Sequence, residues 1–211
     1  MLDKLREAVL QGEYDAVPAL TQGALDTGTT PAELLDSVLI PAMDVVGSEY
    51  ESGIRYIPEM LVSAEAMKAA MTVLRPLLSD CGIEPKGRVL IGTVEGDLHD
   101  IGKNLVVTML EGAAFEVIDL GVEVEANRFV EALREHQPDV LALSALLTTT
   151  MVFMPQVIER IEEADLRTSV KIIVGGAPIT EEYAGRIGAD GYAEDAAAAV
   201  TVVKELLGIT A

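Results

Sequence analysis

One short segment of the sequence gathers side chains that could do chemistry, and it reads Glu-Gly-Asp-Leu-His-Asp-Ile-Gly over residues 95–102. Asp97 lies two residues before His99, close enough for its carboxylate to hydrogen-bond one imidazole nitrogen. Such a contact fixes the tautomer and raises the basicity of the other nitrogen, as carboxylates do behind metal-bound histidines. Asp100 fits the N-cap of a helix that begins at Ile101. The plainer alternative is a solvated loop histidine.

Two later segments carry polar side chains or bare backbone in apolar surroundings. Ser144, Thr148 and Thr150 interrupt a strongly apolar stretch. Their hydroxyls could satisfy loop backbone groups or hydrogen-bond a buried ligand. Gly175 and Gly176 follow another apolar run, where they could form a plain turn or let a ligand lie directly against the backbone.

The elements that must position these segments follow from alternating apolar runs and amphipathic stretches after residue 87. We predict strands at Arg88–Thr93, Phe115–Asp119, Val140–Leu143, Lys171–Val174 and Gly191–Ala193. We predict helices near Ile101–Gly112, Glu125–His136, Met151–Glu163, Thr180–Ile187 and Asp195–Leu206. Five such units imply a parallel sheet covered on both faces, for which the flavodoxin-like order 2-1-3-4-5 suits the length. Ligands of such sheets bind at the carboxyl ends of the strands, where the three segments converge.

The first 80 residues show helical periodicity and little strand signal. Thr30 and Pro31 mark the start of the third of four expected helices, within which Pro41 is expected to introduce a kink. Pro58 opens the fourth. Four helices with short connections suggest an antiparallel bundle.

The chain is therefore predicted to be an α/β protein with two domains. Its 211 residues suffice for a core in each. A four-helix bundle cap is expected at residues 1–86 and a flavodoxin-like (Rossmann-like) five-stranded parallel sheet domain at 87–211. Residues 81–87 are the expected linker.

The composition excludes several classes of function. Fifteen Lys and Arg against 35 Asp and Glu give a net charge of −20, which repels phosphates, so we expect no nucleic-acid and no membrane partner. The single cysteine, Cys81, excludes a disulfide framework, a zinc ribbon and a protein-ligated iron–sulfur cluster, and it fits a reducing cytosol. The charged start of the chain lacks the apolar core of a signal peptide, so the expected location is cytoplasmic.

Three alternative sites fit the same segments less well. The first segment resembles a phosphate-binding P-loop, but five residues rather than four separate its glycines, and Asn104 stands where a magnesium-binding hydroxyl is required. Phosphoacceptor receiver domains resemble one another in an Asp at the end of the third strand, where this chain has Ser144. A zinc hydrolase needs several His or Cys ligands, and the chain holds only His99 and His136 as histidines.

The segments resemble the cobalamin-binding family typified by cobalamin-dependent methionine synthase and the small corrinoid proteins of methyltransferase systems. Three motifs, in order along the chain, carry the resemblance: Asp-x-His-x-x-Gly at Asp97, His99 and Gly102, Ser-x-Leu at Ser144 and Leu146, and Gly-Gly at Gly175 and Gly176. The helical half is similar to the family's cap domain, notably at Tyr56-Ile57-Pro58. The resemblance covers nearly the whole chain.

The resemblance implies that cobalamin binds with its dimethylbenzimidazole displaced from cobalt and its nucleotide tail threaded into the sheet domain. His99 would be the lower axial ligand of cobalt, Asp97 would bond its other nitrogen, and the hydroxyl of Thr150, where methionine synthase has serine, would complete the relay. Ser144 and Thr148 would contact the buried base. The full set implied at the cofactor is Gly96, Asp97, His99, Asp100, Ile101, Gly102, Ser144, Leu146, Thr148, Thr150, Gly175, Gly176 and Ala177, with Tyr56, Met60 and Met67 at the upper face. The last three are equally well explained as bundle core.

The function implied by the resemblance is that of a stand-alone corrinoid methyl carrier, in which Co(I) accepts a methyl group and methyl-Co(III) gives it up. We expect a methyl donor:corrinoid methyltransferase to load the methyl group and a methylcorrinoid:acceptor methyltransferase to pass it to a folate or a thiol. A reductive activase is the third expected partner. Methanol, methylamines, betaines and methoxylated aromatics all fit as donors. The alternatives are a cobalamin-dependent sensor and a cobalamin storage or delivery protein.

Overall fold

The computed structural model describes residues 1–81 and 85–209, and the chain divides into two compact units. The first unit comprises Met1–Lys86 with Thr108–Ala114, and the second comprises Gly87–Val107 with Phe115–Ala211. The predicted linker at 81–87 spans the first boundary, and its residues 82–84 lie outside the described residues. Each unit is described by itself below.

The first unit is helical, as the periodicity predicts. Its elements are α1 (Leu2–Leu10), α2 (Val17–Asp26), α3 (Pro31–Leu34), the π-helix η1 (Leu35–Leu39), α4 (Ile40–Glu51) and α5 (Ile57–Asp80). The first three α-helices and α4 all contact α5 in this unit, and the fully buried side chains of Leu5, Leu34 and Leu74 belong to its core. Within the described part of the chain, no helix is both long enough and apolar enough to cross a membrane.

Local sequence explains how the third helical stretch begins and why it contains a π-helical turn. The Thr30 hydroxyl accepts the backbone N–H of Glu33 at 3.2 Å, and the Glu33 carboxylate accepts the Thr30 N–H at 2.9 Å, so the two form a capping box. Directly before Pro41, where the sequence predicts a kink, the structure has a π-helical turn in which the N–H of Ile40 donates to the carbonyl of Leu35. Pro41 has no N–H to continue the α-helical bonding, which favours the wider turn just before it.

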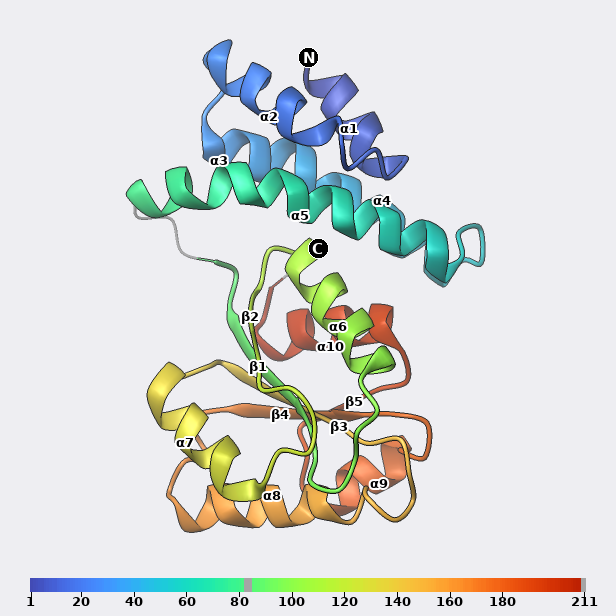
Figure 1. The fold of residues 1–211 in the computed structure, drawn as a ribbon, viewed down its shortest axis with the longest axis vertical. Helices are drawn as coiled ribbons and strands as arrows, with labels where there is room; N and C mark the ends of the chain where they lie inside the picture. Colours follow the sequence, from blue (N-terminus) through green and yellow to red (C-terminus); the bar gives the residue numbers. More distant parts are fainter. Residues whose placement is uncertain (82–84, 210–211) are drawn as a thin grey trace. The chain divides into compact units, whose positions relative to one another are not determined.

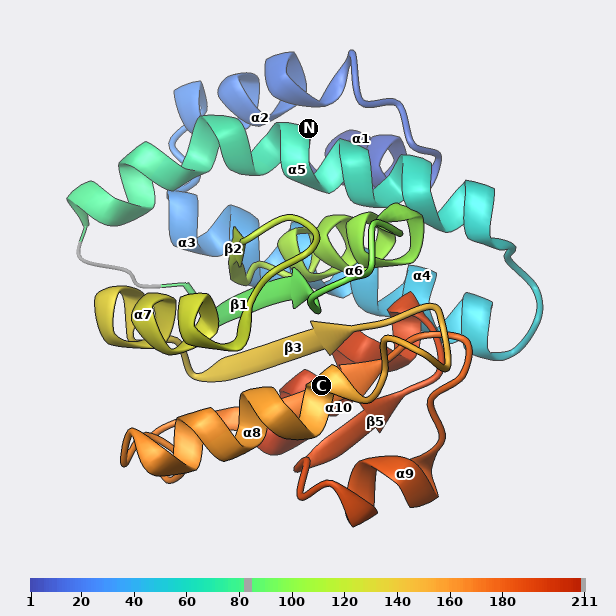
Figure 2. The same cartoon turned by 60° about the horizontal axis from the view of Figure 1, so that its bottom comes forward.

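The second unit is a five-stranded parallel sheet in the predicted order, β2-β1-β3-β4-β5. The strands are β1 (Arg88–Thr93), β2 (Glu116–Asp119), β3 (Val140–Ser144), β4 (Lys171–Gly175) and β5 (Gly191–Ala193). The helices are α6 (Ile101–Gly112), whose end from Thr108 is assigned to the first unit, α7 (Ala126–His136), α8 (Phe153–Glu163), α9 (Glu181–Arg186) and α10 (Ala196–Leu206). Helices α7, α8 and α9 cover one face of the sheet, and α6 and α10 lie on the other (Figures 1 and 2).

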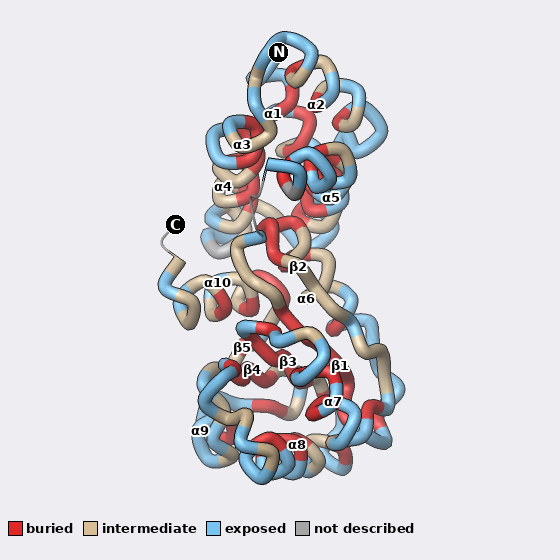
Figure 3. The backbone as a smooth tube through the Cα atoms, turned by 90° about the vertical axis from the view of Figure 1, so that its left-hand side faces the viewer, coloured by how far each residue is buried: buried red, intermediate tan, exposed pale blue. Residues whose placement is uncertain are grey.

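The central strands are buried on both faces, which is why their sequences are continuously apolar. Strands β1, β3 and β4 each have at least three consecutive buried residues, and they run through the buried interior drawn red in Figure 3. Several predicted boundaries in the sheet unit differ from the structure by one residue, and one differs by two. The helix expected from Met151 begins at Phe153, because residues 148–152 form turns that hold Thr150.

Candidate functional site

The carboxyl ends of four strands form one row across the sheet. Thr93 of β1 pairs with Ser144 of β3, Ser144 pairs with Gly175 of β4, and Gly175 pairs with Ala193 of β5. Because the strands end at the same level, the connections that follow them emerge at a single edge. This register brings together the three segments that the sequence singles out.

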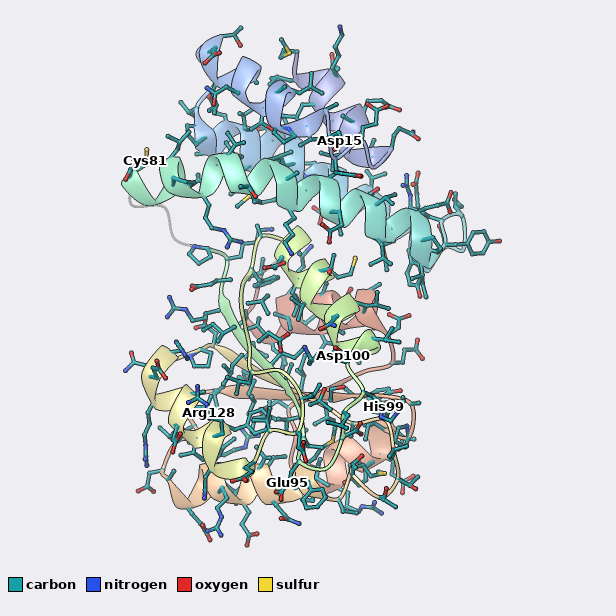
Figure 4. The ribbon with its side chains drawn as sticks, viewed as in Figure 1. Asp15, Cys81, Glu95, His99, Asp100 and Arg128 are labelled. Atoms are coloured by element: carbon teal, nitrogen blue, oxygen red, sulfur yellow. The ribbon has the colours of Figure 1, made fainter. Side chains whose placement is uncertain are left out.

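The first of these connections, between β1 and α6, fixes an imidazole against a buried carboxylate. Asp97 has no exposed surface, whereas the side chain of His99 is 51% exposed. The Asp97 Oδ1 atom lies 2.7 Å from His99 Nδ1 and also accepts the backbone N–H of His99 at 3.0 Å. Figure 4 shows Glu95, His99 and Asp100 along this connection. The expected contact between Asp97 and His99 is present.

The second oxygen of the same carboxylate is held by the connection between β3 and α8. The Thr150 hydroxyl donates to Asp97 Oδ2 at 2.6 Å, and the backbone N–H of Leu146 donates to the same atom at 2.7 Å. Thr150 is itself buried. The hydroxyl relay His99–Asp97–Thr150 is therefore present in the structure, together with a main-chain donor.

The four hydrogen bonds decide the charge of Asp97. Burial alone raises the pKa of a carboxyl group, because desolvation disfavours the charged form. The hydrogen bonds from Thr150, Leu146 and His99 outweigh that effect and hold the pKa of Asp97 well below its usual value. Asp97 is therefore a fixed negative charge at neutral pH.

That charge determines which imidazole nitrogen is available to a ligand. An ionised carboxylate is an acceptor only, so His99 donates its Nδ1 proton to it. The neutral ring then carries its lone pair on Nε2, for which the described residues provide no hydrogen-bond partner. A single basic imidazole on an exposed loop suits a metal whose other positions are filled by a macrocycle.

The same two connections and the first residue of α6 carry exposed apolar side chains. They are Leu98, Ile101, Leu146, Leu147 and Val152, of which Ile101 is 79% exposed and Leu98 68%. An added Cβ at Gly102 would meet nothing within 4 Å, so the first turn of α6 presents open space beside them. An imidazole donor, exposed apolar side chains and open backbone are groups that would fit a corrin, with His99 as the residue that would hold its metal.

The two adjacent glycines after β4 are explained by contacts within the chain. Gly176 has a φ of +123°, and a Cβ placed there would overlap the carbonyl oxygen of Ala145. A Cβ on Gly175 would lie 2.9 Å from the carbonyl oxygen of Ala193. Close approach of the backbones therefore requires glycine at both positions, whether or not a ligand also lies there.

The remaining predicted residues of the sheet unit are found on the same connections. Ser144 and Gly175 are half-buried in the terminal row, whereas Gly96, Thr148 and Ala177 are exposed. Asp100 precedes α6, as expected of an N-cap. The hydrogen bond that its carboxylate receives, however, comes from the Asn104 side chain at 3.2 Å.

The three residues expected at the upper face of the cofactor, Tyr56, Met60 and Met67, belong to the helical unit. Met60 and Met67 are 1% and 0% exposed, so their side chains belong to the core of that unit. Tyr56 is 70% exposed at the start of α5. Of the three, Tyr56 alone offers a side-chain surface to a ligand.

Two buried polar side chains next to the candidate site escaped sequence reasoning. Thr93, fully buried, donates its hydroxyl to the His99 carbonyl at 3.1 Å and so fixes the backbone of the histidine. The sequence signal that could have indicated Thr93 is a hydroxyl at the end of an otherwise apolar strand. Lys103, 3% exposed, pairs with Asp119 at the end of β2 and donates to Asn104 at 2.8 Å, which ties α6 to the edge strand.

Comparison with known proteins gives matches over nearly the whole chain. Two family models, each described as a B12 binding domain, match residues 87–201 and residues 1–75. A corrinoid protein of Desulfitobacterium hafniense (strain Y51) is 41% identical, with 99% of this chain and 98% of that protein covered. Dimethylamine corrinoid protein 1 of Methanosarcina acetivorans is 43% identical, with 98% and 97% covered.

A solved structure extends this similarity to three dimensions. The methanol:cobalamin methyltransferase complex of Methanosarcina barkeri contains a chain that matches with a TM-score of 0.86 and 30% identity. The match covers 98% of this chain and 79% of that one. The similarity therefore extends over both units.

Proposed function

The chain belongs to the family of cobalamin-binding corrinoid proteins, and from this premise we propose that it is a methyl carrier serving two methyltransferases. One partner loads the methyl group, and the other passes it to a folate or a thiol. A reductive activase is the third proposed partner. The bound corrinoid supplies the cobalt that carries the methyl group, while the protein supplies ligation, orientation and access.

The observation that supports the proposal is the Asp97 carboxylate next to His99, both of whose oxygens already accept hydrogen bonds from the chain. Asp97 accepts four hydrogen bonds from within the chain, two of them from His99 itself. This arrangement leaves Nε2 of His99 as the donor atom for cobalt. Asp97 holds the tautomer and the orientation of the ring, and Thr150 holds Asp97.

For the other predicted residues, we propose contacts with the cofactor from their positions at the ends of the strands. Gly102 and Ile101 are proposed to lie against the corrin ring, because both are open to solvent beside the imidazole. Ser144, Thr148 and the loop at Gly175 are proposed to line the path of the nucleotide tail, because they follow β3 and β4 at the same edge.

We propose a small methylated amine as the methyl donor of the loading partner. A relative at 43% identity is named a dimethylamine corrinoid protein, whereas the matched chain of the methanol complex is 30% identical. The chain is proposed to need its partner for this step. Purified, reduced holoprotein is expected to show no turnover with methylamines or methanol until a cognate methyltransferase is added.

The experiment that tests the ligand assignment compares the two histidines of the chain. Wild-type protein, His99→Ala and His136→Ala are reconstituted with cobalamin, and stoichiometry and absorption spectrum are recorded. His136 ends α7 and serves as the control. We expect one cobalamin per chain and imidazole ligation in the wild type and in His136→Ala, and water ligation in His99→Ala.

Two results would contradict the proposal. An unchanged ligation spectrum in His99→Ala would remove the axial role from His99. Failure of the reduced holoprotein to take up one methyl group per cobalamin from methyl iodide would exclude the carrier function and favour storage or delivery.

A further inference from the structure

The connection between β3 and α8 supplies two of the four donors on Asp97, so its own support bears on the site. Leu146 gives a backbone N–H and Thr150 gives a hydroxyl, both to Oδ2. These two donors fix the plane of the carboxylate whose other oxygen holds His99. Whatever holds this connection in place therefore also acts on the histidine.

The start of the connection is held by the loop after β4. The N–H of Ala145 donates to the carbonyl of Gly175 at 3.3 Å, and Gly176 packs directly against the Ala145 carbonyl. The glycine backbone allows this approach. Leu146 follows immediately, so its N–H is positioned from β4.

The other end of the connection is held by a side chain from α9. The Tyr183 hydroxyl donates to the carbonyl of Met151 at 2.7 Å, across 32 residues of sequence. Met151 directly follows Thr150. The turn that presents the Thr150 hydroxyl to Asp97 is thus fixed at the residue next to it.

Tyr183 is itself rigidly placed. Its side chain belongs to the core cluster of the sheet unit and is 8% exposed, and its N–H donates to the Thr180 hydroxyl at 3.1 Å. The Arg186 guanidinium lies over the ring, 5.1 Å from its centroid. Burial raises the pKa of Tyr183, so the phenol keeps its proton and remains a donor.

We propose that Tyr183 is a positioning residue for the cobalt-ligating histidine, acting through Met151, Thr150 and Asp97. This inference rests on the proposed function for the role of His99. Within the described part of the chain, Tyr183 forms no hydrogen bond with the histidine or the carboxylate; it acts by fixing the turn that carries Thr150. Loss of its hydroxyl should loosen the Thr150 donor directly and, because the Leu146 N–H donates to the same Asp97 oxygen, weaken the Leu146 hydrogen bond through the carboxylate.

The test removes only the hydroxyl, in Tyr183→Phe, and keeps the ring. Tyr192→Phe is the matched control, because the Tyr192 side chain packs against the same core cluster and its hydroxyl makes no hydrogen bond within residues 1–81 and 85–209. Hydrogen exchange of the Leu146 amide and the ¹⁵N spectrum of the histidine rings are recorded in the apoprotein at one fixed pH. His136 is the internal reference for the ring signals.

In Tyr183→Phe we expect the Leu146 amide to exchange roughly 2- to 12-fold faster, the range that corresponds to losing one neutral hydrogen bond. The His99 ring signals should shift away from the Nδ1–H tautomer, while those of His136 and of Tyr192→Phe match the wild type. A loss of stability alone, with the Leu146 and His99 signals unchanged, would overturn the proposal and assign Tyr183 to packing.

These measurements separate the inference from the function on which it rests. The apoprotein signals test the positioning role without any corrinoid. Cobalamin titration of the wild type tests the proposed ligand assignment. In holoprotein that shows imidazole ligation, Tyr183→Phe should lower the ligated fraction, and an unchanged fraction would again refute the positioning role.

Discussion

Gly176 and Gly102 both belong to motifs of the family, yet the structure predicts opposite effects on stability when each is replaced by alanine. At Gly176 the φ of +123° is unfavourable for any side chain, and the new Cβ would overlap the Ala145 carbonyl oxygen. Strained backbone of this kind costs about 1–3 kcal/mol before any clash. With displacement of the Ala145 backbone added, we expect Gly176→Ala to destabilise the sheet unit by about 3 kcal/mol or more.

Gly102→Ala should act in the other direction. The residue lies in the first turn of α6, and an added Cβ would meet nothing within 4 Å. Replacing glycine by alanine at a compatible site stabilises by about 0.4–1 kcal/mol, because the unfolded chain loses conformational freedom. The two substitutions are therefore expected to differ by roughly 4 kcal/mol with opposite signs.

The assay is urea denaturation of the apoproteins followed by circular dichroism, since the chain has no tryptophan. A second arm measures cobalamin affinity, which Gly102→Ala should weaken because its methyl group would project into the proposed place of the corrin ring. Equal stability of Gly176→Ala and wild type would refute the steric reasoning. Wild-type cobalamin affinity in Gly102→Ala would remove Gly102 from the binding surface.

Three further predictions concern the donors and charges at the site. Thr150→Val keeps the side-chain shape but removes a hydrogen bond to a buried carboxylate, so it should lower the free energy of unfolding by about 1.5–3 kcal/mol. Thr150→Ser keeps the hydroxyl and should retain most of the wild-type free energy of unfolding. Urea titration of the two variants tests this difference. The folded-state pKa of Asp97 lies below the unfolded value of ~3.9, so its charge stabilises the fold above that pH and this stabilisation is lost as the pH falls towards the folded value. The urea midpoint of Asp97→Asn should therefore fall less steeply on acidification than that of the wild type, and parallel curves would contradict the assignment. Thr93→Val should shift the His99 backbone amide resonance while leaving that of His136 unchanged, because the Thr93 hydroxyl holds the His99 carbonyl.

The fold could be predicted from the periodicity of apolar residues, because each helix and each strand repeats a simple pattern. The buried strands are continuous runs such as Val-Leu-Ala-Leu from Val140, and their parallel order follows from alternation with helices. The pairing of Asp97 with His99 was also predictable, because it spans only two residues. Local pattern and short separation are the properties that a single sequence displays.

What escaped prediction depends on contacts between distant parts of the chain. The Leu146 donor is a main-chain N–H, which any residue possesses, so nothing in the sequence marks it. Tyr183 reads as an ordinary core residue of a short helix. Met60 and Met67 have the helical spacing of core residues and are core residues, and only burial separates them from the exposed Tyr56.

The long separation of the Asp97 partners has a consequence for biosynthesis. Leu146 and Thr150 follow Asp97 by 49 and 53 residues. At about 5–20 residues per second, the ribosome exposes Asp97 and His99 roughly 3–10 s before the Thr150 codon has been translated and its residue has emerged. During that interval the carboxylate lacks the Leu146 and Thr150 donors, which hold its second oxygen in the folded chain. For the proposed ligation by His99, we therefore expect cofactor loading to follow the pairing of β3 with β1.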